Sequence, residues 1–153
     1  MTASDNLEIR PLAIEEAELA AETERLCLNR EAWSADGIRE TLTRNGYYFA
    51  AYVDGEFAGH AGFTAILDEG GITNIAVKPQ FRRKGIASAL TAELINKAKH
   101  LNMSFLTLEV RESNLAAISL YEKHGFTVRG RRKRFYSEPF EDALIMTVDF
   151  KEG

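Results

Sequence analysis

Residues 75–87 read Ile75-Ala76-Val77-Lys78-Pro79-Gln80-Phe81-Arg82-Arg83-Lys84-Gly85-Ile86-Ala87, and this is the most informative segment of the chain. Its first residues end a run over 72–77 that predicts a strand, which Lys78-Pro79 closes. Apolar residues recur at helical spacing from Gly85 to Leu101, which predicts a helix directly after the turn. A strand, a basic turn and a helix therefore follow one another without a linker.

The basic turn has the features of an anion-binding site. Gly85 and Ala87 lack bulky side chains, so backbone amides at the helix start can approach a phosphate. The helix dipole and the side chains of Arg82, Arg83 and Lys84 favour the same anion. An ordinary solvated turn would explain the glycine but would not require a small residue at position 87. The turn matches neither a Walker loop nor a Rossmann fingerprint, which disfavours nucleotide hydrolysis and hydride transfer.

The rest of the chain divides into short periodic segments with turn signals between them. Asp54-Gly55 separates two alternating runs and predicts a two-residue type I′ hairpin. Ser34 and Ser113-Asn114 suit helix N-caps, and Gly125 suits the position after a helix. In chain order the sequence predicts strand 7–12, helix 13–29, a helix from Ser34 to Arg44, strands 47–53, 57–67 and 72–77, helix 85–101, strand 104–110, a helix from Ser113 to Gly125, and strands 126–132 and 143–150.

The order β-α-α-β-β-β-α-β-α-β-β predicts an α+β fold with a mixed central sheet. Helices between the later strands imply parallel crossovers, whereas hairpins near both ends imply antiparallel pairing. At 153 residues, with 45% hydrophobic and 27% charged residues, the chain fits one globular domain over residues 1–153 and leaves no room for a second.

Charge is distributed unevenly along the chain. Residues 1–70 hold 14 acidic and 5 basic residues, whereas residues 71–153 hold 9 acidic and 14 basic residues. The formal net charge of -4 argues against direct nucleic-acid binding. An acidic half is suited to a cationic substrate and a basic half to an anionic one.

Cysteine usage and hydropathy predict a cytoplasmic protein without membrane contact. The single cysteine, Cys27, excludes an internal disulfide and is expected as a small buried residue on the first helix. Residues 1–6 lack the basic and apolar pattern of a secretion signal, and no apolar run approaches the ~20 residues of a membrane span.

Two side chains in the second half are candidates for proton transfer. Alternation along strand 104–110 places Glu109 at the C-terminal end of a central strand, where ligands gather in α/β sheets. An ion pair with Arg111 or another cation is the alternative role. Tyr121 lies seven residues after Asn114, so both share one helix face, although a tyrosine there also suits the core.

The turn and the motifs around it resemble the GNAT superfamily of N-acetyltransferases. Arg82-x-x-Gly85-x-Ala87 resembles its acetyl-CoA pyrophosphate loop. Further motifs resemble the RimI branch, whose members acetylate protein N-termini, and the resemblance covers about residues 7–150. These motifs are Ala32-Trp33-Ser34, Asn74 to Val77, Leu108 to Arg111, Ser113-Asn114, Ala117, Leu120-Tyr121-Glu122, Gly125-Phe126 and Glu141 to Met146.

The resemblance implies roles for individual residues, with acetyl-CoA as co-substrate and a protein N-terminus, typically of a small-subunit ribosomal protein, as acceptor. Glu109 would be the general base and Tyr121 the general acid. Backbone groups at 75–77 would contact the pantetheine arm, the turn would wrap the pyrophosphate, and Asn114 would contact the cofactor. The implied acetyl-CoA residues are Ile75, Ala76, Val77, Arg82, Arg83, Lys84, Gly85, Ile86, Ala87, Ser88 and Asn114.

Other candidates have simpler explanations. His60, His100 and His124 are far apart in sequence, so we predict no metal site. Trp33 suits either an acceptor wall or a hydrophobic staple at the following N-cap. The basic residues within 129–134 suit a solvated edge strand, facing solvent or the cofactor, in which like charges discourage pairing with another sheet.

Three functions fit the sequence: a protein N-terminal acetyltransferase, an acetyltransferase for a polyamine or antibiotic, and a non-catalytic CoA-binding regulator. Glu109 and Tyr121 count against the regulator, which needs no proton-transfer groups. An α-amine has a pKa of about 7.7–8.0 against about 10.4 for lysine, so freeing its lone pair costs ~3.3–3.7 kcal/mol less at neutral pH. This difference favours the N-terminal acceptor.

Overall fold

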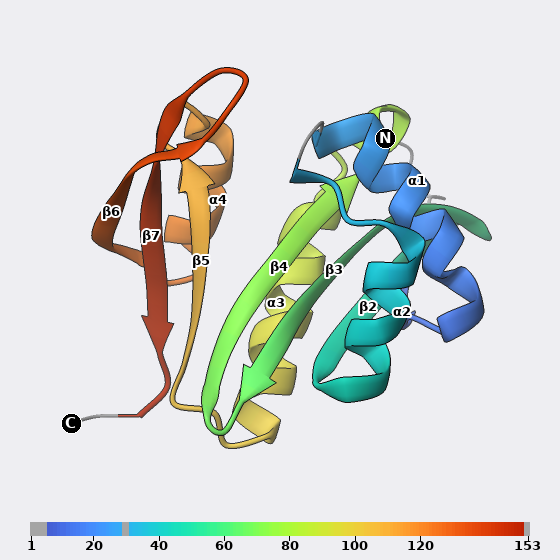
Figure 1. Ribbon diagram of the computed structural model, residues 1–153. Helices are drawn as coiled ribbons and strands as arrows, with labels where there is room; N and C mark the ends of the chain where they lie inside the picture. Colours follow the sequence, from blue (N-terminus) through green and yellow to red (C-terminus); the bar gives the residue numbers. More distant parts are fainter. Residues whose placement is uncertain (1–5, 29–30, 152–153) are drawn as a thin grey trace.

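The structure is a computed structural model that describes residues 6–28 and 31–151. Its strands form one seven-stranded mixed sheet in the order β1-β2-β3-β4-β5-β7-β6 (Figure 1). The strands are β1 (Leu7–Pro11), β2 (Gly46–Val53), β3 (Glu56–Ile66), β4 (Glu69–Val77), β5 (Phe105–Arg111), β6 (Thr127–Tyr136) and β7 (Glu141–Asp149). The helices are α1 (Ala17–Leu28), α2 (Ala35–Arg44), α3 (Ile86–His100) and α4 (Leu115–Lys123), with short 3₁₀ turns at Ile14–Glu16 and Pro79–Phe81. The predicted α+β class and element order are confirmed.

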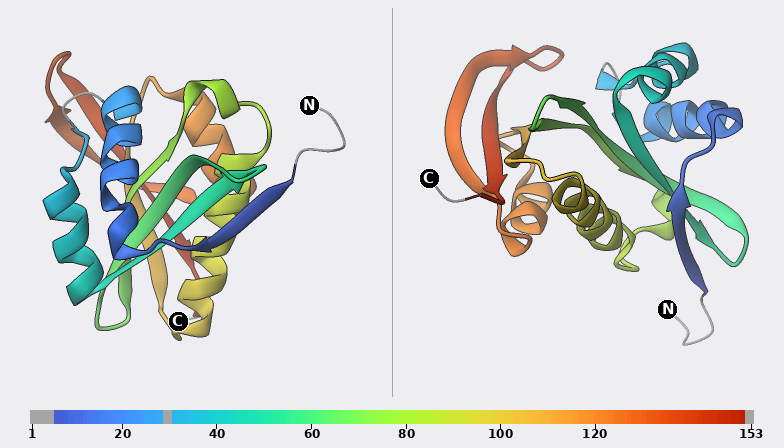
Figure 2. Two further views of the ribbon diagram at one scale, coloured as in Figure 1. Left: turned by 90° about the vertical axis from the view of Figure 1, so that its right-hand side faces the viewer. Right: turned by 90° about the horizontal axis from the view of Figure 1, so that it is seen from below.

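Helices cover both faces of the sheet (Figure 2). On one face α1 and α2 pack over a buried cluster that includes Ile38 and Phe57. On the other face α3 and α4 pack over a larger cluster that includes Leu90, Leu106 and Phe126. The acidic N-terminal helices and the helix that follows the basic turn therefore lie on opposite faces.

Local signals fix several boundaries as the sequence predicts. Asp54-Gly55 joins β2 to β3 with φ values of 49° and 83°, the left-handed pair that a type I′ turn requires. Ser34 caps α2, since its Oγ accepts a hydrogen bond of 3.0 Å from Gly37 N. Asn114 caps α4 in the same way, and Gly125 follows this helix with φ of 93°. These turns and caps are confirmed.

Other boundaries differ from the prediction. The expected first helix is split into a 3₁₀ turn and α1, and its predicted end at residue 29 lies outside the described residues. β4 begins at Glu69 rather than at 72, because Gly70 lies in the strand where β4 packs closely on β5. A Cβ at Gly70 would lie 2.5 Å from a methyl group of Leu106, so glycine is needed there although it is rare in strands. β6 continues to Tyr136 rather than ending at 132, so the whole basic run belongs to the strand.

The sheet opens between β4 and β5. These parallel neighbours pair only where Glu69–Gly71 lies opposite Phe105–Thr107, and beyond this point they diverge (Figure 1). β4 nevertheless continues to Val77 and β5 to Arg111. Towards their C-terminal ends, each strand therefore has one edge that does not pair with the other.

Candidate active site

Two adjoining cavities occupy the opening between β4 and β5. The first, here called the turn cavity, has a volume of about 550 Å³ and is lined by the end of β4, the basic turn and α4. The second, here called the carboxylate cavity, has a volume of about 260 Å³ and contains Glu31, Glu109 and Tyr136 on its wall. The residues that line both cavities are Cys27, Leu28, Ile75, Asn114, Ala117 and Tyr121.

The basic turn is shaped to present backbone N–H groups. Arg83 and Gly85 have φ values of 64° and 77°, so left-handed residues precede the first turn of α3. Such a conformation costs of order 1–3 kcal/mol at a non-glycine residue and is typical of ligand-binding loops. A Cβ at Gly85 would meet no atom within 4 Å, so open space lies in front of the backbone. Six predicted phosphate-binding residues line the turn cavity, Arg82, Arg83, Gly85, Ile86, Ala87 and Ser88, whereas Lys84 is not on its wall.

Arg82 and Cys27 converge on the end of β4. Arg82 Nε donates to the Val77 carbonyl at 3.3 Å, and Cys27 Sγ donates to the same oxygen at 3.3 Å. Arg82 Nη2 lies 3.4 Å from the sulfur. The prediction of a buried cysteine is wrong, because Cys27 is half-buried and faces both cavities. Periodicity identified its helix but not the strand end against which it packs.

Ser88, in the first turn of α3, is joined to the end of α4. Its Oγ lies 2.8 Å from Nε2 of His124. Burial, and then the positive charge of Lys123, lower the pKa of His124. The neutral imidazole is thus favoured at neutral pH, and its Nε2 can accept a hydrogen bond from the Ser88 hydroxyl group. This contact fixes α4 against the phosphate-binding end of α3.

The end of β4 offers an unpaired backbone edge to the turn cavity. Ile75, Ala76 and Val77 pair with β3 on one side. On the other side the pairing with β5 stops at Gly71. All three residues line the turn cavity. Extended ligands that contain amide groups can form strand-like hydrogen bonds with such an edge.

Glu109 lies on β5 with its carboxylate at the carboxylate cavity. The predicted alternation is confirmed, since Leu108 and Val110 are buried and Glu109 is partly exposed. The alternative ion pair is also present, but with a different cation: Arg132 Nε lies 3.4 Å from Glu109 Oε2. Burial, and then the charges of Glu109 and Glu31, raise the pKa of the nearby Tyr136 to about 12. Glu109 therefore acts on this cavity electrostatically.

Tyr121 belongs to the core and to the site. Its side chain is only 9% exposed and its ring packs 5.6 Å from that of Phe126. Burial, and then Tyr136, raise the pKa of Tyr121 to about 12, so its phenol is protonated at neutral pH. Asn114 lines the same two cavities, as the shared helix face predicted. Its N-cap bond uses only Oδ1, which leaves the amide nitrogen as a donor.

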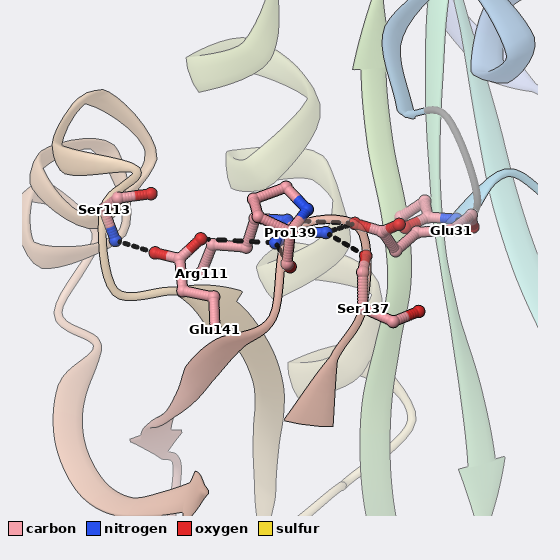
Figure 3. Close-up of polar contacts among 7 residues, drawn as sticks. Glu31, Arg111, Ser113, Ser137, Pro139 and Glu141 are labelled. Atoms are coloured by element: carbon pink, nitrogen blue, oxygen red, sulfur yellow. Dashed lines mark hydrogen bonds and ion pairs between the residues drawn. The ribbon is translucent and has the colours of Figure 1, made fainter. Parts of the chain in front are cut away.

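Arg111 bridges the opening near the carboxylate cavity (Figure 3). Its Nε and Nη2 donate to Glu31 Oε1, beyond α1, at 3.1 and 3.0 Å. Its Nη1 donates to Glu141 at 3.2 Å and to the Pro139 carbonyl at 3.0 Å, in the β6–β7 segment, and Nη2 donates to the Ser137 carbonyl at 3.2 Å. The sequence analysis missed this bridge, because Glu31 lies 80 positions away in the chain.

A buried polar cluster supports the bridge from the α1 side. His60 and Glu24 are 0% and 1% exposed, with 2.7 Å between Nε2 and Oε2. The other Glu24 oxygen accepts from Trp33 N at 2.7 Å and from Asn74 Nδ2 at 3.0 Å, and Asn74 also donates to the Glu31 carbonyl at 3.3 Å. Sequence reasoning missed Glu24, which has no distinguishing mark among the glutamates of its helix. The cluster fixes the segment that carries Glu31.

The surroundings of Trp33 and of the basic strand β6 distinguish between the roles that the sequence left open for them. Trp33 lines neither cavity and packs against the cluster of Ile38, which supports the staple interpretation. β6 is an edge strand as predicted. Its arginines are nevertheless paired rather than solely solvated: Arg129 with Asp149, Arg131 with Glu112 and Asp142, and Arg132 with Glu109. Arg132 is therefore largely exposed to solvent, as predicted, while its guanidinium also pairs with Glu109.

Within residues 6–28 and 31–151, no group of three or more His, Cys, Asp or Glu side chains is arranged to hold a metal ion. None of the helices in the described part of the chain has the length and apolar character needed to cross a membrane.

Comparisons with known proteins agree with this geometry. Residues 9–126 match the profile of the Acetyltransferase (GNAT) family. A protein of Bacillus subtilis (strain 168) is 38% identical over 122 residues, 78% of this chain and 81% of that protein. The [ribosomal protein bS18]-alanine N-acetyltransferase of Escherichia coli (strain K12) is 40% identical over 118 residues, 76% of this chain and 80% of that protein. The crystal structure of the ribosomal-protein-S18-alanine N-acetyltransferase from Escherichia coli superposes with a TM-score of 0.89 at 31% identity, covering 97% of this chain and 96% of that chain.

Proposed function

The chain belongs to the GNAT family of acetyltransferases, and on this premise we propose that it transfers the acetyl group of acetyl-CoA to the N-terminal α-amine of a ribosomal protein. The observation that carries the proposal is the pair of adjoining cavities, one with a phosphate-binding turn and one with Glu109, which share Tyr121 on their walls. The Escherichia coli relative, named for alanine acetylation of ribosomal protein bS18, supports the choice of acceptor.

The residues present fit acetyl-CoA. The open space in front of Gly85 is a cradle that a side chain would fill, at a helix N-terminus that favours phosphate. The unpaired edge of β4 at 75–77 suits the amides of a pantetheine arm. Acetyl-CoA supplies an activated thioester when it is bound. Arg83 and the backbone of the turn bind its pyrophosphate, and Asn114 donates a hydrogen bond to it through the free amide nitrogen.

Glu109 and Tyr121 manage the protons of the transfer. Glu109 accepts a proton from the acceptor amine, directly or through a water molecule, and so frees the lone pair for attack. Tyr121 is protonated at neutral pH and donates its proton to the departing thiolate. Because Tyr121 is buried against Phe126, its ring holds the hydroxyl in one place. Glu109 lines the carboxylate cavity and Tyr121 lines both cavities, so both groups can act where the two cavities adjoin.

The acceptor side suits a cationic chain end. Glu31 and Glu109 place two carboxylates on the wall of a small cavity of about 260 Å³. α1 carries an excess of acidic residues and lies on the opposite face of the sheet from α3, the helix that follows the basic turn (Figure 2). The acceptor peptide and the CoA phosphates would thus meet fields of opposite sign. Three arginines of β6, Arg129, Arg131 and Arg132, are paired with carboxylates, which reduces their repulsion of a cationic peptide. Peptides with basic residues after the first position should bind best at low salt.

Matched peptides test the acceptor. A peptide with a free N-terminus and blocked lysine should be acetylated about 10²-fold faster than the same peptide with a blocked N-terminus and free lysine, since its amine is neutral far more often at pH 7. Labelled acetyl-CoA gives kcat/KM for both, with the processed N-termini of the organism's ribosomal proteins as sequences. Spermidine and an aminoglycoside form the comparison arm. Faster lysine transfer, or transfer only to the small amines, would replace this proposal with the alternative acceptor class.

Gly85→Leu tests the phosphate-binding turn. A side chain at this position would occupy the space reserved for the pyrophosphate, so we expect calorimetry to show CoA affinity reduced by about 10–100-fold. Gly55→Leu is the matched control, because Gly55 also has a positive φ of 83° and open space around its Cβ position, but lies in the distant β2–β3 hairpin. Both variants carry similar backbone strain, and only Gly85→Leu should lose affinity. Equal CoA affinities in the two folded variants would refute the assignment.

We further assign residues 1–153 to one N-acetyltransferase domain acting in the cytoplasm. The single sheet supports this, because strands from both ends of the described chain, β1 and β7, belong to it. A ribosomal-protein acceptor would be met in the cytoplasm, without a membrane and without direct contact to nucleic acid.

A further inference from the structure

The last turn of α4 carries a cation to the turn cavity. Lys123 lines this cavity together with Ala116 and Leu120, which precede it on the same side of the helix. The cations of the basic turn, Arg82 and Arg83, line the same cavity. Among the described residues, no carboxylate lies within ion-pair distance of Lys123. Its charge is thus available to a ligand.

The position of Lys123 is fixed by its neighbour. His124 Nε2 lies 2.8 Å from the Ser88 hydroxyl, so the end of α4 is fastened to the first turn of α3. Lys123 directly precedes His124 in the chain, and its positive charge contributes to the lowered pKa of the His124 ring. A phosphate-binding helix start and a second cation from another element therefore meet at one end of the cavity.

CoA carries two separate phosphate groups, a pyrophosphate and a 3′-phosphate on its adenosine. The turn of α3 has one helix N-terminus and one set of left-handed residues, which suit the pyrophosphate. Arg82 is already engaged with the Val77 carbonyl and Cys27. Lys123 is a further lining cation, contributed by a different helix. Ala116 and Leu120 beside it offer an apolar surface for the ribose and adenine.

We propose that Lys123 binds the 3′-phosphate of CoA and makes the protein prefer CoA to dephospho-CoA. The proposal rests on the proposed function for the presence of CoA in the turn cavity. Lys123 takes no part in proton transfer, so its contribution is to affinity alone. A lysine is suited to this task because its ammonium is a point charge that can reach a mobile phosphate monoester.

Calorimetric titration of Lys123→Met with CoA and dephospho-CoA tests this directly. Methionine keeps the apolar stem and removes the charge. We expect CoA affinity to fall about five- to tenfold, as for one charge-assisted contact at a partly exposed site, and dephospho-CoA affinity to stay within about twofold. Lys123→Arg should retain most of the preference. Lys99→Met removes the same charge at the exposed C-terminal end of α3. It should leave the affinity for both ligands unchanged, and so controls for the effect of net charge on the binding of an anion.

Each other outcome overturns the proposal. Equal losses for the two ligands would assign Lys123 to the pyrophosphate, and unchanged affinity for both would leave it without a phosphate contact. Thermal unfolding of each variant without ligand shows whether it is folded, and Lys123→Gln provides a second uncharged variant. If the unaltered protein binds neither CoA nor dephospho-CoA, the proposed function itself fails, which a wild-type titration distinguishes from failure of the Lys123 assignment.

Discussion

Glu109→Gln is expected to lower kcat by ~10²–10⁴-fold near pH 7, because a positioned general base contributes that much to proton transfer. Glutamine has the same shape and cannot accept the proton. The loss should shrink as the pH rises from about 7 to 9, since an α-amine with pKa near 8 then loses its proton to solvent without help. Steady-state rates at several pH values, with an N-terminal peptide and labelled acetyl-CoA, measure this recovery. A constant defect across that range would contradict the role of base.

Two further variants separate catalysis from structure. Arg132→Gln breaks the same 3.4 Å ion pair with Glu109 but keeps the carboxylate, so its effect on kcat should be much smaller. If Arg132→Gln lowers kcat as much as Glu109→Gln does, the ion pair, and not a role of Glu109 as general base, accounts for the loss of activity. Tyr121→Phe keeps the ring against Phe126 and removes the proton donor, so it should slow transfer while acetyl-CoA still binds. Its defect should show no recovery of the Glu109→Gln kind at alkaline pH.

Glu24→Leu is expected to lower the free energy of unfolding by about 3–5 kcal/mol, since it removes one partner of a fully buried polar pair. His60 would lose its partner in a fully buried place, and Trp33 N and the part-buried Asn74 amide would each lose an acceptor. Urea unfolding followed by circular dichroism gives the change in midpoint and slope.

Glu22→Leu is the matched control for this loss. It makes the same substitution on the same helix at an exposed position, where the expected change is within about 0.5 kcal/mol. If the two variants were equally stable, the buried cluster would not be holding the α1 side of the site in place.

Much of the fold could be predicted because its signals are local. Asp54-Gly55, the Ser34 and Asn114 caps and the run into Gly85 each specify a turn or helix end within a few residues. The start of β4 could not be predicted, because Gly70 is a strand residue only through its contact with Leu106, which lies far along the chain. The end of β6 at Tyr136 could not be predicted for a similar reason, because the carboxylate partners of its arginines lie on other segments.

The candidate site was predictable where it depends on backbone and on short motifs. The turn, the end of β4 and the faces of β5 and α4 all meet at the two cavities as the sequence suggested. The bridge of Arg111 to Glu31 and the pair of Glu24 with His60 were not predictable, since the partners lie 80 and 36 positions apart. Ion pairs of that kind depend on how helices pack on the sheet, which periodicity does not specify.

The incomplete pairing of β4 with β5 has a consequence for self-association. At the rim of a sheet, a strand edge with free N–H and C=O groups is a template on which other molecules can pair and aggregate. Here the unpaired edge of β4 is recessed, with Cys27 and Leu28 on one side and Ala117 and Tyr121 on the other. The cavity at this edge, of about 550 Å³, can hold an extended ligand, whereas pairing with the edge strand of another folded molecule needs an edge exposed at the rim of the sheet. The β4 edge can thus form hydrogen bonds with a ligand without promoting aggregation between copies of the protein.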